Sequence, residues 1–249
     1  MHVDALHRHM IMEAQPLHDS VKTFLTPTVP EDYADRIITL QPFLNRLNRY
    51  TLPHRVFNAI KHESGITVEQ GKYCAEWLPK HLQDGIKADI RIYWLVDRTY
   101  SRRVQVTPAI WKRWHNWFWY YTMHELIHRV QDHHRPEADA RVFAVDTEDQ
   151  KLKEQQTYLS DYDEIEAYSH DIAFEMHMHF PDLSYRAALE AVKRSGPSTP
   201  YNTYRMYRRS FAETPNHPTL RALHRKLPKW YASIETYRSF YTDTLQWQA

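Results

Sequence analysis

Two histidines four residues apart, His124 and His128, flank Glu125 in the segment HELIH. On an α-helix, residues four apart differ by about 40° around the axis, so both imidazoles would point the same way and could share a zinc ion. Glu125 falls about 60° beyond His128 on the same side of the helix. From there it could take a proton from a zinc-bound water molecule. The spacing therefore predicts a metal site with Glu125 as its general base.

Two histidines do not complete a zinc site, so a third ligand is needed. His134 stands where the metzincin pattern has its third histidine. That pattern needs glycine at the position that Gln131 holds, because the chain must turn sharply there. With Gln131 the helix would continue, and His134 would lie about 9 Å along the axis from His128. His134 is the weaker of the alternatives.

The stronger candidate for the third ligand is Glu164, in the segment YLSDYDEIEAY. On a helical wheel Glu164 shares a narrow stripe with Asp171 and Glu175, and apolar residues lie on both sides of that stripe. Carboxylates held between two apolar arcs are costly unless they are paired or bind a metal. We therefore expect Glu164 to be a ligand and Asp171 to orient a ligand histidine.

Glu166 is a further alternative as the third ligand. It shares a broad polar face of the same wheel with His170 and His177. Such a face predicts exposure to solvent, so Glu164 is preferred over Glu166.

The segment around HELIH has the start and stop signals of one long helix. Thr107 is a good N-cap and Pro108 suits the first helical position. The helix can run to about His134, before Pro136 stops it. A second helix is expected after Ser160 or Asp161, because Asp161 and Glu164 have capping-box spacing, and it should end before Pro181.

Residues 90–96 alternate between apolar and polar positions, which predicts a β-strand. A turn over 98–101 and the apolar residues Val104 and Val106 predict a β-hairpin with this strand. Residues 33–60 are predicted to be helical, with a break near Pro53. The fold class is therefore expected to be α+β and mostly helical, with a small hairpin or sheet before the long helix.

Composition narrows the class of protein further. With 249 residues, 42% of them hydrophobic and 25% charged, the chain is typical of a globular protein that can bury a sizeable core. Four glycines disfavour an all-β fold, and the single cysteine, Cys74, excludes an internal disulfide framework. The tryptophan- and tyrosine-rich segment 111–121 is expected to pack in the core. We expect one domain over 1–249, with a helical part (1–87), a metal-site core (88–180) and a basic helical part (181–249).

The sequence shows neither a secretory signal nor a segment able to span a membrane. It therefore predicts a soluble, cytoplasmic protein that does not act on a membrane. His2, His7 and His9 are expected on a mobile N-terminal arm.

HELIH followed by a downstream helix with Glu-x-x-Ala (Glu164 to Ala167) resembles the zincin metallopeptidases whose third ligand is a glutamate. The segment YLSDYDEIEAYSHDIA after HELIHRVQ is also similar to metallopeptidases encoded by bacteriophages. The likeness covers about residues 88–180, with motif content at 124–128 and 158–173. The Asn-Glu-x-x-x-Asp signature of the thermolysin type is absent, since Tyr168 stands four residues after Glu164.

The resemblance implies a zinc-dependent peptidase that acts on a peptide or protein, encoded by a virus and present in the host cytoplasm or the virion. Zinc would be held by His124, His128 and Glu164, and Glu125 would act as the base. Tyr168 would be a catalytic residue that stabilises the oxyanion, with Tyr158 as the alternative. The strand at 89–97 could hold an extended peptide by strand addition.

Two other functions remain open. The scaffold could serve as a non-enzymatic virion or assembly protein that contacts other virion proteins. Alternatively, the basic C-terminal part could bind nucleic acid, because residues 185–230 contain ten basic residues against only Glu190 and Glu213. The residues that could carry such binding are Arg205, Arg208 and Arg209 together with Tyr201, Tyr204 and Tyr207.

Overall fold

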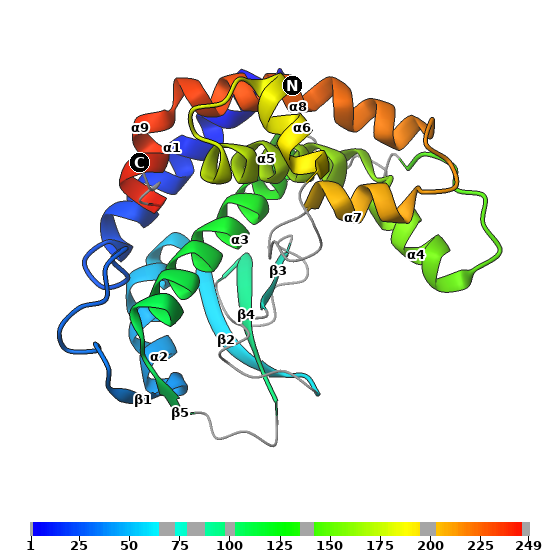
Figure 1. Cartoon of the computed structure of the whole chain (residues 1–249). Coiled ribbons are helices and arrows are strands. Elements are labelled where there is room, and N and C mark those ends of the chain that lie inside the picture. Colours follow the sequence, from blue (N-terminus) through cyan, green and yellow to red (C-terminus); the bar gives the residue numbers. More distant parts are fainter. Residues whose placement is uncertain are drawn as a thin grey trace. The chain divides into compact units, whose positions relative to one another are not determined.

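A computed structural model describes residues 2–64, 73–78, 88–97, 103–134, 142–194 and 203–245 (Figure 1). The chain is mostly helical and has a small amount of sheet, which confirms the expected α+β class. The helices are α1 (Val3–Val21), α2 (Leu40–Thr51), a 3-10 turn η1 (Leu52–His54), α3 (Pro108–His134), α4 (Gln150–Leu159), α5 (Tyr162–His179), α6 (Tyr185–Arg194), α7 (Thr203–Ser210), α8 (Pro218–Thr236) and α9 (Arg238–Leu245). The strands are β1 (Ile37–Thr39), β2 (Val56–His62), β3 (Tyr73–Trp77), β4 (Ile90–Val96) and β5 (Arg103–Gln105). Over the described ranges, every helix is too short or too polar to cross a lipid bilayer.

The chain divides into two compact units. Within the described ranges, unit 1 contains residues 2–8 and 130–241, and unit 2 contains residues 9–129 and 242–245. The boundaries fall inside helices α1, α3 and α9, so each of these helices contributes residues to both units.

Unit 2 contains a three-stranded mixed sheet, with strand order β2-β4-β3, and a two-stranded sheet of β1 and β5. β2 runs parallel to β4, and β3 runs antiparallel to it. β4 therefore has a neighbour on each side. The predicted hairpin is wrong, because β5 pairs antiparallel with β1 instead of β4.

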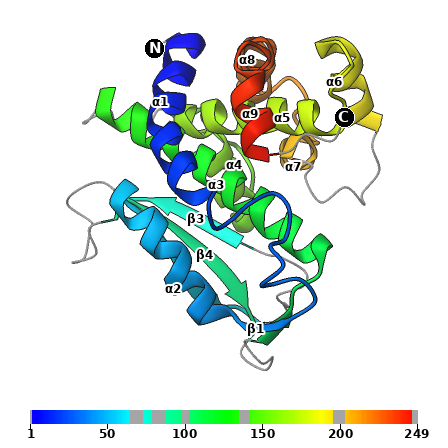
Figure 2. The ribbon, with the colours of Figure 1, turned by 90° about the vertical axis from the view of Figure 1, so that its left-hand side faces the viewer.

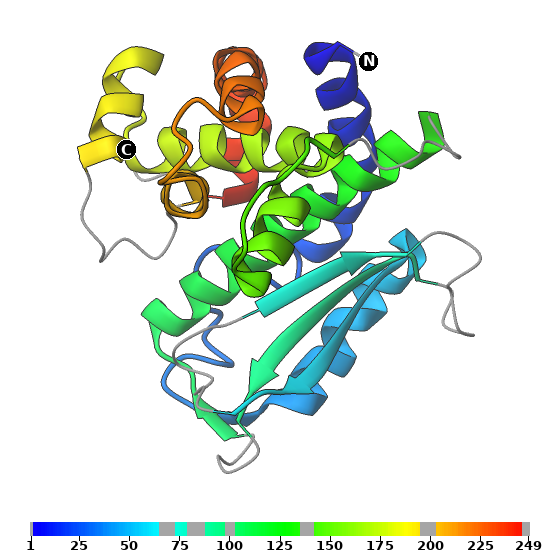
Figure 3. The same ribbon diagram turned by 90° about the vertical axis from the view of Figure 1, so that its right-hand side faces the viewer.

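One face of this sheet is covered by aromatic side chains from two helices. The Trp94 ring of β4 lies 5.8 Å from the Phe43 ring of α2 and 5.4 Å from the Trp114 ring of α3, measured between centroids. Figures 2 and 3 show α2 running along the sheet. The fully buried aromatic side chains of α3 are Trp111, Trp114, Phe118 and Trp119. These four residues are core residues, as predicted for this segment.

Residues 33–60 are only partly helical, so the prediction for this segment is partly wrong. The helix is confined to α2, and Val56–His62 forms strand β2. Between them Arg55 takes a left-handed backbone conformation, with φ of 67°, that ends the helical path. Pairing with β4 then supplies the hydrogen bonds that hold 56–62 extended.

In unit 1 the helix α5 packs against α8, and it also contacts α4, α6 and α7 (Figure 3). His7 belongs to this unit and is fully buried in α1, so the mobile arm predicted for the N-terminal histidines is wrong at this position. Its ring nitrogens lie 2.8 Å from Ser233 Oγ and 2.7 Å from the Tyr241 hydroxyl oxygen. The first turns of the chain are thus held by its last helices.

We predict that Asn48→Ala destabilises the protein by about 2 kcal/mol. The buried Asn48 amide donates to the Asn58 carbonyl oxygen (3.0 Å) and accepts from the Asn58 backbone N–H (2.7 Å), so its loss leaves two groups of β2 without these bonds. Urea unfolding gives the free energy. As a matched control, Asn45→Ala on the exposed face of α2 should change it by less than about 0.5 kcal/mol. Equal effects of the two substitutions would contradict this account of the α2–β2 contact.

Candidate metal centre

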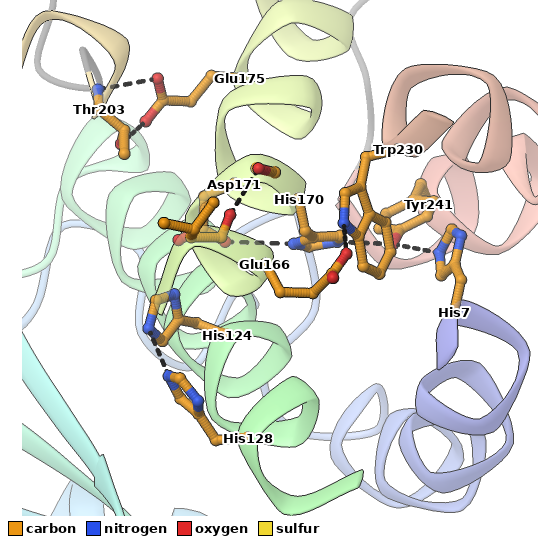
Figure 4. A network of polar contacts seen from close by, with 12 residues as sticks. His7, His124, His128, Glu166, His170, Asp171, Glu175, Thr203, Trp230 and Tyr241 are labelled. Carbon is orange, nitrogen blue, oxygen red and sulfur yellow. Dashed lines mark hydrogen bonds and ion pairs between the residues drawn. The ribbon is translucent and has the colours of Figure 1, made fainter. Parts of the chain in front are cut away.

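The two histidines of HELIH lie together on α3. The Nε2 atoms of His124 and His128 are 3.2 Å apart (Figure 4). Two nitrogens bound to one tetrahedral zinc ion would be separated by about 3.3 Å, given Zn–N bonds of about 2.05 Å. His124 is buried and His128 is half-buried. The pair thus has a separation that suits two ligands of one ion.

The helix that carries His124 and His128 begins where the sequence predicts. Thr107 caps α3, since its Oγ1 accepts the backbone N–H of Ile110 at 3.2 Å, and Pro108 is the first helical residue. Leu126 and Ile127, which lie between the histidines, are buried in the core. Burying these two side chains turns the opposite face of the helix, with the histidines, away from the apolar core.

An ion-pair network next to His128 fixes the position of α3 within unit 2. Arg129 Nε lies 2.6 Å from Glu13 Oε2 of α1, and Arg129 Nη1 lies 3.3 Å from Asp89 Oδ1 just before β4. Asp89 is buried and also pairs with Arg55 at 3.3 Å. Because Arg129 and Asp89 are largely withdrawn from water, removing either partner would leave a buried charge uncompensated.

In unit 1 the start of α5 carries Glu164. Asp161 is the N-cap of α5, and its carboxylate accepts the Asp163 N–H at 2.8 Å, as the sequence signals predict. Gln131, one turn after His128 on α3, donates from Nε2 to the Asp163 carbonyl oxygen at 3.4 Å. Glu164 is half-buried, and its Oε2 atom is buried. Gln131, at the position where the metzincin pattern has glycine, thus contacts Asp163, the residue before Glu164.

Tyrosine side chains lie near Glu164 within unit 1. The Tyr158 ring is half exposed, but its hydroxyl lies 3.3 Å from the Tyr168 hydroxyl and within hydrogen-bonding reach of Glu164. Burial of the hydroxyl, with the neighbouring Tyr168 and Glu164, raises the pKa of Tyr158. Tyr158 therefore stays protonated and can donate to the carboxylate. Both tyrosines named from the sequence, Tyr158 and Tyr168, are thus near Glu164.

Sequence reasoning missed a third tyrosine, Tyr207 of α7, for which it suggested base stacking. Tyr207 is fully buried, and its ring lies 5.8 Å from that of Tyr168. Burial raises the pKa of Tyr207 well above its ordinary value, and Tyr168 and the Glu164 charge raise it further. Among the described residues its hydroxyl has no hydrogen-bond partner. The spacing of Tyr204 and Tyr207, three residues apart on one helix, is a signal of a buried face that could have identified it.

The expectation that Glu166 faces solvent is wrong. Glu166 is buried, accepts Trp230 Nε1 at 2.7 Å and pairs with Lys226 (Figure 4). His170 and His177, on the same face, are buried as well. The reason is that α8 covers this face and brings its own cation and indole N–H to it.

The remaining carboxylates of the predicted stripe are buried, as expected. Glu175 accepts the Thr203 backbone N–H at 3.2 Å and the Thr203 hydroxyl at 2.5 Å. Asp171 Oδ1 lies 3.2 Å from His170 Nδ1, and His170 Nε2 lies 2.9 Å from the Tyr241 hydroxyl. A proton on Nδ1 of His170 would leave Nε2 as the acceptor of the Tyr241 O–H.

His134 ends α3 and is exposed, because the helix continues through Gln131 without the turn of the metzincin pattern. The helical rise places it about 9 Å along the axis from His128. This distance makes His134 a poor partner for His124 and His128.

No protein-family model matches the chain, and no curated protein or solved structure matches it either. The likeness to the zincins therefore depends on the motif residues and on the geometry around them.

We predict that Lys226→Met destabilises the protein by about 3 kcal/mol, because it leaves the Glu166 carboxylate buried without its cation. Lys193→Met, which removes the more exposed Lys193–Glu190 pair, should cost less than about 1 kcal/mol. Urea unfolding compares the two variants. In the double variant Glu166→Gln, Lys226→Met, much of the lost stability should return. An equal cost for the two single substitutions would show that Glu166 does not depend on Lys226.

Proposed function

We propose that the protein is a zinc-dependent peptidase of zincin-like architecture, with His124, His128 and Glu164 as its ligands. Together these three residues make up a group that could hold a metal ion. The observation that carries the proposal is the 3.2 Å separation of the two histidine Nε2 atoms on a helix that also presents Glu125. Two imidazoles and one carboxylate suit zinc and leave a fourth position for water, as in catalytic rather than structural sites.

The hydrogen bond from Gln131 to the Asp163 carbonyl supports Glu164 over its rivals. It joins the helical turn after His128 to the first turn of α5, where Glu164 stands. Glu166 is neutralised by Lys226, and His134 lies too far along α3. Tyr158 can donate to Glu164 and so hold the orientation of the ligand carboxylate.

A zinc ion held there would acidify a water molecule and polarise a peptide carbonyl. Glu125, buried beside the pair, would accept the proton from that water and pass it to the leaving amine. Tyr168 is proposed to donate its hydroxyl proton in a hydrogen bond to the oxyanion. Glu125 thus moves the proton, and Tyr168 stabilises the charge that develops on the substrate.

For peptide binding we propose strand β3 in place of the strand at 89–97. β4 is flanked by β2 and β3, so it has no free edge for strand addition. Among the described strands, β3 pairs only with β4. Burial is the main cause that raises the pKa of Cys74 on β3, and Glu125 is the last of several charges that act on it, so β3 lies within electrostatic range of the proposed base. An extended peptide could therefore pair with β3 while its carbonyl faces Glu125.

We predict about one zinc ion per chain in the native protein, measured by elemental mass spectrometry after dialysis. Glu164→Ala should weaken zinc binding by about 100-fold or more, because loss of a direct ligand costs more than loss of an outer partner. His134→Ala and Glu166→Gln are the matched controls and should keep the zinc. Zinc that is lost from a control and retained in Glu164→Ala would refute the proposed ligand set.

We predict that Glu125→Gln keeps its zinc and lowers peptide hydrolysis by about 10²- to 10⁴-fold, the usual contribution of a general base. Hydrolysis is followed on a library of fluorogenic peptides, and zinc is measured in the same samples. Glu148→Gln, an exposed carboxylate outside the proposed ligand group, should change neither. Full hydrolysis by Glu125→Gln would rule out the proposed base. Zinc without hydrolysis in the native protein would favour a non-enzymatic role among virion proteins.

A further inference from the structure

Three helices of unit 1 meet at Tyr204 and His224. The Tyr204 hydroxyl of α7 lies 3.0 Å from His224 Nε2 of α8, and the two rings are stacked with centroids 5.8 Å apart. α6 also contacts α7. This contact brings together exposed cationic side chains that are far apart in the sequence.

Lys193 of α6 and Arg208 of α7 are both close to this contact. Burial lowers the pKa of His224, and the charges of Lys193 and Arg208 lower it further. Tyr204 is within the field of the same two cations. Lys193 and Arg208 are therefore near one point of the surface, and both are exposed.

Arg221 and Arg225 extend the positive charge along α8. Arg221 stands three residues before His224, and Arg225 directly follows it. All three side chains are exposed. Residues 221 and 225 are four apart, so they lie on one face of α8, about 6 Å apart along its axis. We call Lys193, Arg208, Arg221 and Arg225 the basic patch.

The basic patch is poorly neutralised by the protein itself. Lys193 pairs with Glu190, an exposed neighbour on its own helix. Among the residues that the structure describes, none of the three arginines forms an ion pair. Four cations against one carboxylate leave three positive charges close together. Such a surface repels itself and attracts a polyanion.

We propose that the basic patch binds the sugar–phosphate backbone of a nucleic acid. Three of its four cations are arginines, whose guanidinium groups can hold phosphate oxygens through two parallel hydrogen bonds. The surface spans three helices, which suits a ligand with repeating charges. This proposal goes beyond peptidase activity and does not depend on zinc.

The mode of binding is contact with phosphates, without stacking of bases. Of the three tyrosines that the sequence suggested as stacking platforms, Tyr204 and Tyr207 are 3% and 0% exposed, and Tyr201 lies outside the described residues. The rings of Tyr204 and Tyr207 support α7 from within and are not accessible to a base. Binding should therefore be strongly dependent on salt and nearly indifferent to base sequence.

The test is fluorescence anisotropy with a labelled 20-base-pair DNA duplex over a range of sodium chloride concentrations. The native protein should bind in about the 1–100 µM range at physiological salt. The triple variant Arg208→Ala, Arg221→Ala, Arg225→Ala should bind at least about tenfold more weakly. The slope of log K against log salt should become shallower by about 2.7, because each of the three lost phosphate contacts contributes about 0.9. Circular dichroism verifies that the variant is folded.

The matched control removes the same charge from exposed positions in unit 2, with Arg36→Ala, Arg49→Ala and Lys112→Ala. It should bind DNA as the native protein does. Three results would overturn the proposal: no binding by the native protein at low salt, an equal loss in the control, or competition by polyglutamate as effective as that by DNA at equal charge. The last result would instead assign the patch to an acidic protein. Repeating the titration with EDTA separates this outcome from any failure of the zinc site.

Discussion

Carboxylates withdrawn from water on one helix have to be compensated, and α5 carries three buried ones, Glu166, Asp171 and Glu175, besides the half-buried Glu164. Glu166 pairs with Lys226 and Trp230, and Glu175 receives two hydrogen bonds from Thr203. Asp171 lies against His170. A carboxylate in such surroundings requires a cation or several donors, since its transfer from water otherwise costs several kcal/mol. The helices that pack against α5 in unit 1 are therefore selected for the donors that they bring, as well as for their apolar faces.

The partners of Glu166 and Glu175 differ in kind from those of Glu164. Lys226 and Thr203 belong to the chain itself, so Glu166 and Glu175 are committed to holding α8 and α7. Glu164 instead lies among tyrosine hydroxyls, which can donate hydrogen bonds but cannot neutralise a charge. A metal ion bound there would add a positive charge beside this carboxylate. This difference separates the residue proposed to act in the reaction from the two that build the scaffold around it.

Much of α3 and α5 could be predicted because the signals are local. Thr107 and Pro108 mark the start of α3, and Asp161 marks that of α5, through contacts within one turn. The strand partners could not be predicted, because the alternation in residues 90–96 does not tell which segments pair with this strand. In the structure its partners are β2 and β3. The exposure of Glu166 was misjudged for a related reason. A helical wheel assumes that polar residues face water, whereas here a polar face is covered by α8, sixty residues later.

The contact of His7 with Ser233 and Tyr241 has a consequence for synthesis of the chain. The partners are 226 and 234 residues apart in sequence, whereas almost all of unit 2 is contained in residues 9–129. As the chain leaves the ribosome, unit 2 can fold while the residues that complete unit 1 have yet to be made. The first turns of α1 have to wait for the last helices, which makes closure of unit 1 a late step of high contact order. During that interval His7 and the carboxylates of α5 are exposed to water, and a chaperone or a nascent-chain protease would encounter unit 1 in this open form.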